Sequence, residues 1–339
     1  MFRVAVAGAT GAVGSTMLRV LEERGFPVTE LRPLASERSE GRELHFLGKP
    51  FTVRRLTEDA FEGIDIALFS AGASRSRSYA PAAVAAGAVV IDNSSAYRMD
   101  PAVPLVVPEV NEAALQGHSG IVANPNCVAA PLVVALKPIA DAVGLERVIL
   151  SSYQSVSGTG QAAVEELRAQ TRGHLEGAEP EPSVYPHPIA FNVLPHIDVF
   201  DETGYTGEER KVMAETRKML DMPDLGVSAT CVRVPVFYAH SQSVQIETTE
   251  PISARAAREL LMAAPGIAVV DEPERSRYPL ARDAAGRDEV FVGRIRADSS
   301  HPRGLAMWIV SDNLRKGAAT NAVQIAESLV TRGWLAGGA

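Results

Sequence analysis

A cysteine between a turn signal and an apolar run is the first candidate for chemistry in this chain. The stretch NPNCVAAPLVVAL, residues 124–136, contains Cys127, one of only two cysteines. Pro131 is tolerated in the first turn of a helix but not in its interior, so the helix is predicted to begin close to Asn126 or Cys127. A helix N-terminus stabilises a thiolate, and its free backbone N–H groups can bind an oxyanion. Cys127 is therefore a candidate nucleophile, although a free cysteine is also commonly a small buried residue.

A cysteine nucleophile needs a base, and a charged substrate needs a counter-ion. The stretch RVPVFYAH supplies a candidate for each, Arg233 and His240. These residues are seven positions apart on what is predicted to be extended chain, so regular alternation would place them on opposite faces. A bend or a loop must intervene if both serve one site. The other histidines, and Cys231 in SATCVRVPV, are interpreted as structural.

A glycine-rich turn near the N-terminus indicates a dinucleotide site. GATGAVG places Gly8, Gly11 and Gly14 at three-residue intervals directly after an apolar run and before a helical pattern. Such a turn lets the backbone approach a pyrophosphate that is bound at the helix N-terminus. The spacing departs from G-x-G-x-x-G, and the same glycines could instead serve tight packing.

The residues after the second predicted strand bear on the choice of cofactor. An acidic residue is expected there for NAD, whereas this chain reads LASERS. Ser36, Arg38 and Ser39 provide a cation and hydroxyl donors suited to a 2′-phosphate, so NADP is favoured over NAD. Glu37 would favour NAD if its side chain faced the ribose. A merely solvated loop is the remaining alternative.

Composition limits the possible functions. A chain of 339 residues is long enough for two domains, and 46% apolar with 22% charged residues is typical of a globular protein. The net charge of −8 argues against a nucleic-acid partner. Two cysteines predict neither a disulfide framework nor a metal site, and they fit a reducing cytoplasm. No apolar run approaches the roughly 18 residues of a membrane span, and no leader is apparent before MFRVAVAGATG.

The elements that must position these residues fall into two patterns. Short buried strands alternating with helices are predicted first, which favours a doubly wound parallel sheet. The strand candidates are 2–7, 28–34, 64–70, 88–92 and 105–107, with helices such as 16–23 and 79–86. After about residue 145, longer β-rich runs predict an α+β domain, and DNLRKGAATNAVQIAESLV predicts a final helix. Residues 171–190 are predicted as an irregular excursion and 271–289 as an exposed charged connection.

Several segments together resemble the aspartate-β-semialdehyde dehydrogenase family. They are NPNCVAAP, YQSVSGTG, GYTGEERKVMAETRKML, RVPVFYAHSQSV and DNLRKGAATNAVQIAE, in an order that covers nearly the whole chain. GATGAVG and the cysteine motif alone would be shared with N-acetyl-glutamyl-phosphate reductases. The other segments favour the aspartate enzyme.

The resemblance implies a role for each matched residue. Cys127 would form a covalent thioester, His240 would be the general acid and base, and Gln154 would position the substrate beside the thiol. Arg233 would bind the α-carboxylate and Glu208 the α-ammonium group. The positions implied for phosphate are Arg98, Asn126 and Lys211; one helical turn separates Glu208 from Lys211, so the two are expected on one face.

The resemblance also implies the cofactor positions. They are Thr10, Gly11, Ala12 and Val13 at the pyrophosphate, and Ser157, Gly158 and Asn313 beside the nicotinamide, with Ala71 and Gly72 nearby. One position departs from several relatives, which carry a hydroxyl residue directly after the cysteine. This chain has Val128, which leaves oxyanion stabilisation to backbone amides.

The implied enzyme is a homodimeric, cytoplasmic, NADP-dependent aspartate-semialdehyde dehydrogenase. It would reduce L-aspartyl 4-phosphate to the semialdehyde, releasing inorganic phosphate, in the biosynthesis of lysine and diaminopimelate, threonine, methionine and isoleucine. A Rossmann domain is expected over residues 1–127 with 313–339, and a catalytic and dimerisation domain over 128–312. The alternatives are a reductase of another acyl phosphate, such as N-acetylglutamyl phosphate, and a non-catalytic dinucleotide-sensing relative.

Overall fold

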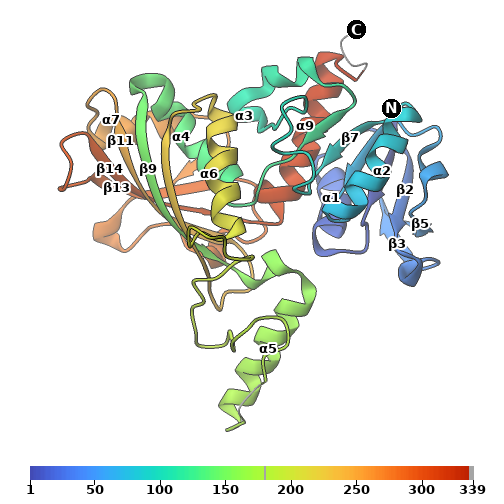
Figure 1. Ribbon diagram of the computed structural model, residues 1–339, viewed down its shortest axis with the longest axis horizontal. Helices are drawn as coiled ribbons and strands as arrows, with labels where there is room; N and C mark the ends of the chain where they lie inside the picture. Colours follow the sequence, from blue (N-terminus) through green and yellow to red (C-terminus); the bar gives the residue numbers. More distant parts are fainter. Residues whose placement is uncertain (179–180, 336–339) are drawn as a thin grey trace. The chain divides into compact units, whose positions relative to one another are not determined.

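The computed structural model describes residues 1–178 and 181–335, which form two compact units (Figure 1). Unit 1 comprises residues 1–126 together with the C-terminal segment from Ala318, and unit 2 comprises Cys127–Gly317. Among the described residues, no helix combines the length and apolar character needed to cross a membrane.

Unit 1 is built on a parallel sheet in the order β5-β2-β1-β6-β7-β8. The strands are β1 (Phe2–Ala7), β2 (Val28–Ala35), β5 (Arg54–Arg55), β6 (Ile66–Phe69), β7 (Val89–Asp92) and β8 (Ile121–Ala123), while β3 (Glu43–Phe46) and β4 (Lys49–Thr52) form a separate hairpin. Helices α1 (Ala12–Glu23), α2 (Ala73–Ala85), α3 (Pro108–Asn111) and α9 (Thr320–Arg332) accompany them.

Both faces of this sheet are buried, because alternate residues of each strand pack on different helices. Val4 and Val6 share a core with residues of α1 and α9, whereas Ala5 and Ala7 share one with residues of α2. Near-continuous apolar strands are what a sheet covered on both sides requires. The predicted doubly wound parallel sheet is thereby confirmed.

Unit 2 contains a mixed sheet in the order β10-β9-β11-β14-β13-β12. Its strands are β9 (Leu145–Gln154), β10 (Gly226–Arg233), β11 (His240–Thr248), β12 (Ile267–Val269), β13 (Val290–Ala297) and β14 (Gly304–Ser311). Its helices are α4 (Ala129–Val143), α5 (Gln161–Leu175), α6 (Gly207–Leu220), α7 (Ala254–Ala263) and α8 (Ala281–Ala284). The predicted second α+β domain is confirmed.

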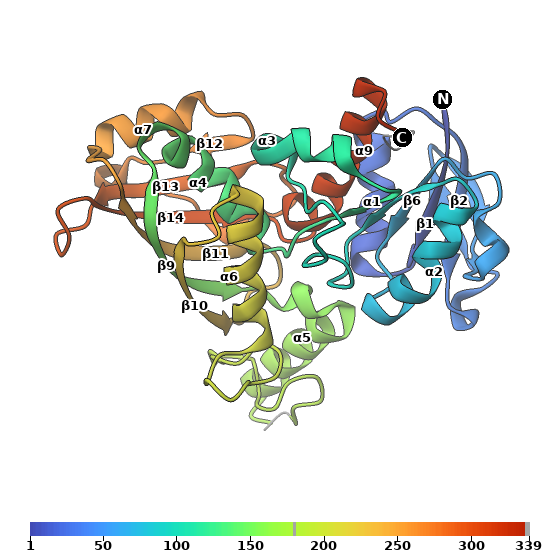
Figure 2. The same cartoon turned by 45° about the horizontal axis from the view of Figure 1, so that its top comes forward.

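One face of the unit 2 sheet is covered by α4, α6 and α7 (Figures 1 and 2). The side chains of β9 alternate accordingly, with Val148, Leu150 and Ser152 buried and Ile149, Ser151 and Tyr153 partly exposed on the opposite face. Helix α5 extends away from the sheet and packs on the short 3₁₀ helix Val156–Thr159.

Some predicted elements were wrong. Residues 105–107 do not form a strand, because prolines at 104 and 108 restrict pairing to one bridge between Leu105 and Ala123, and Pro108 begins α3. Residues 121–123, which were missed, form β8 instead. The excursion over 171–190 begins later than predicted, since α5 continues to Leu175; residues 179–180 of that prediction lie outside the described residues.

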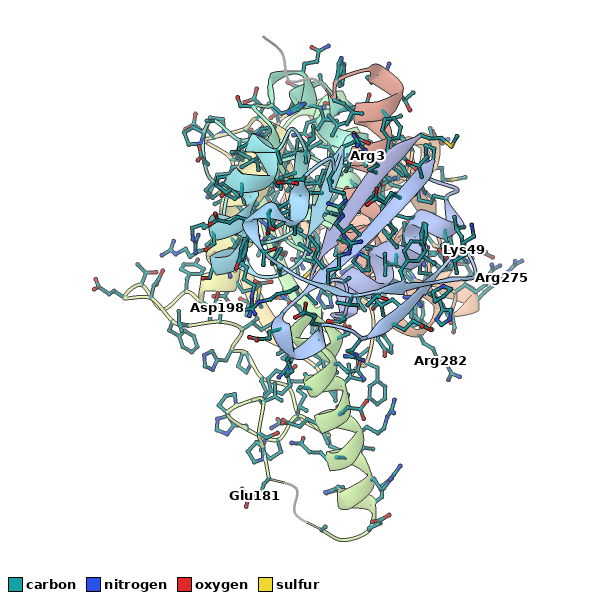
Figure 3. All side chains as sticks on the ribbon, turned by 90° about the vertical axis from the view of Figure 1, so that its right-hand side faces the viewer. Arg3, Lys49, Glu181, Asp198, Arg275 and Arg282 are labelled. Atoms are coloured by element: carbon teal, nitrogen blue, oxygen red, sulfur yellow. The ribbon has the colours of Figure 1, made fainter. Side chains whose placement is uncertain are left out.

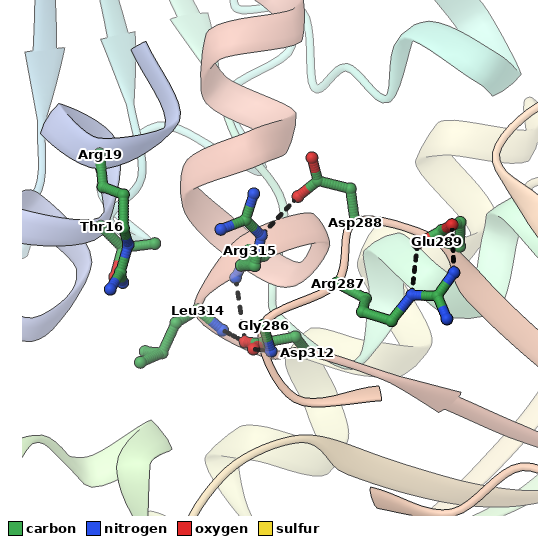
Figure 4. A network of polar contacts seen from close by, with 9 residues as sticks. All are labelled: Thr16, Arg19, Gly286, Arg287, Asp288, Glu289, Asp312, Leu314 and Arg315. Carbon is green, nitrogen blue, oxygen red and sulfur yellow. Dashed lines mark hydrogen bonds and ion pairs between the residues drawn. The ribbon is translucent and has the colours of Figure 1, made fainter. Parts of the chain in front are cut away.

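The segment 271–289 is anchored rather than merely exposed (Figure 4). The carboxylate of Asp312 accepts hydrogen bonds from Gly286 N at 2.7 Å, Leu314 N at 2.8 Å and Arg315 N at 3.2 Å. Arg315 Nε lies 2.7 Å from Asp288 Oδ1. One buried carboxylate therefore joins this segment to the end of β14, directly before Asn313.

Candidate active site

Cys127 lies at the start of α4, as expected, but the helix begins two residues later than predicted. Cys127 and Val128 form a turn, and α4 begins at Ala129. Pro131 is then the third helical residue, where its missing N–H would have had no partner within the helix. The Cys127 side chain is partly exposed, as a nucleophile requires, and it lies beside the helix end that favours negative charge.

A glycine from the other end of unit 2 packs against this cysteine. A Cβ added to Gly317 would lie 3.0 Å from Cys127 O and 3.1 Å from Cys127 Cβ. Gly317 belongs to a short π-helical turn, Arg315–Ala319, that precedes α9. The π-turn was not predicted from the sequence, and it brings a residue without a side chain against the backbone of Cys127.

Gln154, Arg233 and His240 converge at one edge of the unit 2 sheet. Gln154 ends β9, Arg233 ends the parallel neighbour β10, and His240 begins β11 on the other side of β9. The bend that the sequence required is the loop 234–239, which ends in Ala239 at φ 68°. Arg233 and His240 therefore lie on different strands, so the alternation of side chains along one strand does not place them on opposite faces.

His240 is fully buried and has one nitrogen fixed and one available. Its Nδ1 accepts a hydrogen bond from Ser155 N at 3.0 Å and lies 3.1 Å from Ser155 Oγ. Because a backbone N–H can only donate, the neutral ring carries its proton on Nε2. Nε2 has no hydrogen-bond partner among the described residues. Burial, reinforced by the charge of Arg233, holds the pKa of His240 well below its ordinary value.

Gly158 lies directly against both His240 and Arg233, where a side chain would be crowded. A Cβ there would lie 3.0 Å from Arg233 Nη1 and 3.2 Å from His240 Nε2. Arg233 is buried, donates from Nη1 to Ser155 O at 2.8 Å, and lies over the Tyr185 ring. Its Nε has no partner in the described part of the chain. The site thus contains two buried N–H groups, one on the imidazole and one on the guanidinium, that have no partner among the described residues.

Gln154 connects these strand ends to α6. Its Nε2 lies 3.2 Å from Ser152 Oγ and 3.4 Å from Glu208 Oε1. Glu208 is buried, and its Oε2 lies 3.9 Å from Lys211 Nζ, so the two share a face of α6. Lys211 Nζ is closer, at 2.6 Å, to Oδ2 of Asp198, which belongs to the segment between α5 and α6. Asp198 is labelled in Figure 3. Sequence reasoning missed Asp198, which lies in an irregular segment without a periodic signal.

Asn313, Ser157 and the missed residue Ser155 form a buried cluster beside His240. Asn313 Oδ1 accepts hydrogen bonds from Ser155 Oγ at 3.1 Å and Ser157 Oγ at 3.2 Å. The three residues are each at most 3% exposed. Ser155 lies between two residues that had been singled out in YQSVSGTG, which is the only sequence signal that pointed to it.

Cys231 is structural, as its apolar surroundings indicated. It is fully buried on β10, and its backbone N–H donates to Glu209 Oε1 at 2.8 Å. Burial, with Glu208 and Glu209 nearby, raises the pKa of the Cys231 thiol to about 12. The thiol is therefore protonated at neutral pH. Glu209, also missed, completes a capping box with Thr206 at the start of α6.

The glycine turn of unit 1 combines packing with an open helix end. A Cβ at Gly8 would lie 2.3 Å from Ser70 O and 3.1 Å from Ala71 N, and one at Gly14 would lie 2.1 Å from Gly8 O. Both positions therefore require glycine for packing. Gly11 precedes the first residue of α1, so Thr10, Ala12 and Val13 surround the free N–H groups of that helix; Gly72 similarly precedes α2.

The loop after β2 lies beside this turn. The hydroxyls of Thr10 and Ser39 are 3.4 Å apart, and Ser39 is buried while Ser36 is exposed. Glu37 forms an ion pair with Arg55 at 3.2 Å. Arg38 is exposed and makes no ion pair with a described residue. Of the two charged residues within 36–39, Glu37 is therefore paired, whereas the charge of Arg38 has no ion-pair partner among the described residues.

Arg98 and Asn126 are both buried in unit 1, away from bulk solvent. Arg98 donates from Nε to Asn124 O and from Nη2 to Asn93 O, each at 2.9 Å. Asn124 is held in turn by Asn321 Nδ2 at 2.7 Å. Arg98 thus holds the backbone that leads into the cysteine motif. The sequence predicted only a phosphate-binding role for Arg98, and this structural role was not predicted.

Comparisons with known proteins identify the family. Residues 3–118 match the model of the semialdehyde dehydrogenase NAD binding domain, and residues 136–316 match that of the semialdehyde dehydrogenase dimerisation domain. The chain is 59% identical over 336 residues to an aspartate-semialdehyde dehydrogenase of Aquifex aeolicus, covering 98% of this chain and 99% of that one. It is 52% identical to that of Bacillus subtilis, with 96% of each chain covered.

A solved structure agrees with these relatives. Aspartate semialdehyde dehydrogenase II of Vibrio cholerae, crystallised in complex with ASA, superposes with a TM-score of 0.95 at 50% identity, covering 98% of each chain. The sequence resemblance is thereby confirmed, and the chain belongs to the aspartate-semialdehyde dehydrogenase family.

Proposed function

We propose that this protein catalyses the NADPH-dependent reduction of L-aspartyl 4-phosphate to L-aspartate 4-semialdehyde, with release of inorganic phosphate. The observation that carries the proposal is the convergence of Gln154, Arg233 and His240 at one edge of the unit 2 sheet, with Gly158 directly against Arg233 and His240. The family's biosynthetic role, toward lysine and diaminopimelate, threonine, methionine and isoleucine, follows from this reaction.

The reaction begins at Cys127. Its thiolate attacks the acyl carbon of aspartyl phosphate, the bond from that carbon to the phosphate oxygen breaks, and phosphate leaves with the electron pair. An acyl thioester remains on the sulfur. We assign Arg98, Asn126 and Lys211 to the phosphate group, with Lys211 exchanging its half-exposed contact to Asp198 for the ligand.

His240 serves the second half of the reaction as a donor. A nicotinamide dinucleotide, when bound, would supply the hydride that reduces the thioester, whose oxygen gains negative charge and becomes an oxyanion as the carbon is reduced. The proton on Nε2 stabilises that oxygen, because this N–H is buried and unpaired among the described residues. Collapse of the oxyanion breaks the carbon–sulfur bond, which releases the aldehyde and restores the thiolate. Gln154, a neutral amide, positions the acyl group beside the sulfur.

Recognition of the amino acid is assigned to two charged residues. Arg233 presents a buried guanidinium that suits the α-carboxylate, and Glu208 presents a buried carboxylate that suits the α-ammonium group. A substrate with a blocked amine would lose the interaction between its α-ammonium group and Glu208. The site therefore favours a free amino acid derivative over an N-acetylated one.

Unit 1 suits a nicotinamide dinucleotide, and its loop residues favour NADP. Gly8 and Gly14 allow a turn too tight for any side chain, next to the open N-terminus of α1. Because Glu37 is paired with Arg55 and Arg38 has no ion-pair partner among the described residues, we assign Arg38, with Ser36 and Ser39, to the 2′-phosphate. Ser157, Gly158 and Asn313 of unit 2 remain assigned to the nicotinamide half.

We further propose that the protein is a cytoplasmic homodimer. The matched dimerisation-domain model and the half-exposed face of the unit 2 sheet support this assembly. That face carries Tyr153 and Trp308, whose rings lie 5.4 Å apart, a pair typical of interface residues. The free cysteines fit a reducing compartment.

The proposed substrate is tested by assaying the purified protein with NADPH and either L-aspartyl 4-phosphate or N-acetylglutamyl phosphate. Turnover of the first substrate, with the second turned over at least about 10²-fold more slowly, is expected from the lost contact to Glu208. Preference for the acetylated substrate would assign the protein to the other reductase. Absence of turnover with both, while NADPH still binds, would support the dinucleotide-sensing alternative.

A further inference from the structure

The side chain of Asn313 holds the two segments of chain that orient His240. Its Oδ1 accepts a hydrogen bond from Ala239 N at 3.0 Å, directly before the histidine. Ser155 Oγ lies 3.1 Å from both this oxygen and His240 Nδ1, so its single proton can be donated to either acceptor, while Ser155 N donates to Nδ1 at 3.0 Å. Asn313 is 2% exposed, so water does not replace these contacts easily.

The segment that Asn313 holds is one that would not keep its conformation by itself. Ala239 has φ 68°, in the left-handed region that a residue with a Cβ seldom adopts. Such a conformation persists only where the surroundings fix it. The hydrogen bond from Ala239 N to Asn313 provides one such restraint. Ala239 directly precedes His240, so its backbone conformation affects the position of the imidazole.

We propose that Asn313 is a positioning residue for His240, which keeps the imidazole proton on Nε2 and directs it toward Gly158. The proposal rests on the proposed function only in giving that proton a use. It adds to the assignment of Asn313 to the nicotinamide half, because the same residue would then lie beside the cofactor and hold the segments that orient His240.

The anchoring of Asn313 supports this role. Asp312, the preceding residue, accepts hydrogen bonds from three backbone N–H groups, including Gly286 N at 2.7 Å (Figure 4). Asn313 Nδ2 donates to Ser157 Oγ at 3.0 Å, and Ala239 N, which can only donate, fixes Oδ1 as the amide atom that faces it. The oxygen is therefore held in place from both sides before it engages the histidine segment.

The test compares Asn313→Ala with Gln170→Ala. Gln170 is a matched control because its buried Oε1 also accepts backbone N–H groups, from Ile189 at 2.8 Å and Ala190 at 3.1 Å, on α5 rather than beside His240. Both variants lose hydrogen bonds to buried amides, and both are expected to lower the melting temperature. Only Asn313→Ala is expected to lower kcat, by about 10²-fold, as for a displaced catalytic group.

The decisive measurement is ¹⁵N NMR of histidine-labelled protein, with the His240 signals assigned by His240→Gln. The wild type and Gln170→Ala are expected to show His240 as the Nε2–H form, and Asn313→Ala to show a mixture of the two neutral forms. An unchanged His240 signal, together with a raised KM for NADPH and a normal kcat, would overturn the proposal in favour of a cofactor role alone.

A second variant keeps the test decisive if Asn313→Ala does not fold. Ser155→Ala retains the backbone N–H to Nδ1 but removes the hydroxyl that lies 3.1 Å from both His240 Nδ1 and Asn313 Oδ1. A kcat about tenfold below wild type at saturating NADPH is expected, and an unchanged kcat would contradict the proposal. Because the NMR experiment requires no turnover, failure of the proposed reaction in the wild type would leave this inference separately testable.

Discussion

Replacing Gly158 by alanine tests whether the substrate reacts where residue 158 lies against His240 and Arg233. The new Cβ would lie 3.0 Å from Arg233 Nη1, 3.2 Å from His240 Nε2 and 3.3 Å from His240 Cε1, all shorter than the 3.4–4 Å of ordinary contact. The neighbours must therefore move by a few tenths of an ångström. The imidazole has little freedom to do so, because Ser155 holds its Nδ1.

The expected loss follows from this geometry. A displacement of about 1 Å can cost about 10²-fold in rate, so a shift of a few tenths combined with a partly filled site should lower kcat/KM by about 10- to 10²-fold. This corresponds to about 1.4–2.7 kcal/mol of transition-state stabilisation. The fold should tolerate the change, since Gly158 is not in the left-handed region.

The assay measures kcat/KM with aspartyl phosphate and NADPH, and thermal unfolding of the same samples. Gly173→Ala is the matched control, because Gly173 lies within α5 and its added Cβ would be 3.7 Å from Ala178 Cβ. That variant should be more stable by about 0.5–1 kcal/mol at wild-type activity. A Gly158→Ala enzyme with wild-type kcat/KM would refute the assignment of the substrate to this position.

The other predictions concern the nucleophile, its support, the cofactor and pH. Cys127→Ser should abolish turnover while NADPH binding, measured by fluorescence titration, persists; sustained turnover would point to another nucleophile. Gly317→Ala should lower kcat by roughly tenfold by displacing Cys127, with stopped-flow thioester formation as the measurement. Arg38→Ala should raise KM for NADPH by about 10- to 10²-fold but leave KM for NADH unchanged, and equal changes in both would remove Arg38 from the 2′-phosphate. The pKa of His240 is lowered in the folded protein, so below about pH 6.5 the unfolded chain binds a proton that the folded chain does not. The free energy of unfolding should therefore decrease as the pH is lowered below that value. His240→Gln should reduce this pH dependence, as measured by thermal unfolding.

The architecture was predictable because its signals are local. Apolar runs separated by a glycine turn and by helical patterns specified the parallel sheet of unit 1, and the β-rich runs after residue 145 specified the sheet of unit 2. Pro131 placed the start of α4 to within two residues. Proline also explains the failure at 105–107, where flanking prolines limited an apolar run to a single bridge.

The arrangement of the candidate site was less predictable, because it depends on contacts between distant residues. Nothing in RVPVFYAH reveals that the chain leaves β10 after Arg233 and re-enters the sheet on the far side of β9. Asn313 meets Ser155 across 158 positions in the sequence. Asp198 pairs with Lys211 from an irregular segment. The residue types were therefore recognisable, but their partners required the fold.

The contrast between the two cysteines has a practical consequence. Cys231 is fully buried, and its pKa of about 12 leaves almost no thiolate at neutral pH, whereas Cys127 is partly exposed at a helix end. An alkylating reagent should therefore consume one equivalent per chain under native conditions. That stoichiometry would allow the concentration of functional protein in a preparation to be counted directly, and it would let an electrophilic inhibitor be attached at a single known atom.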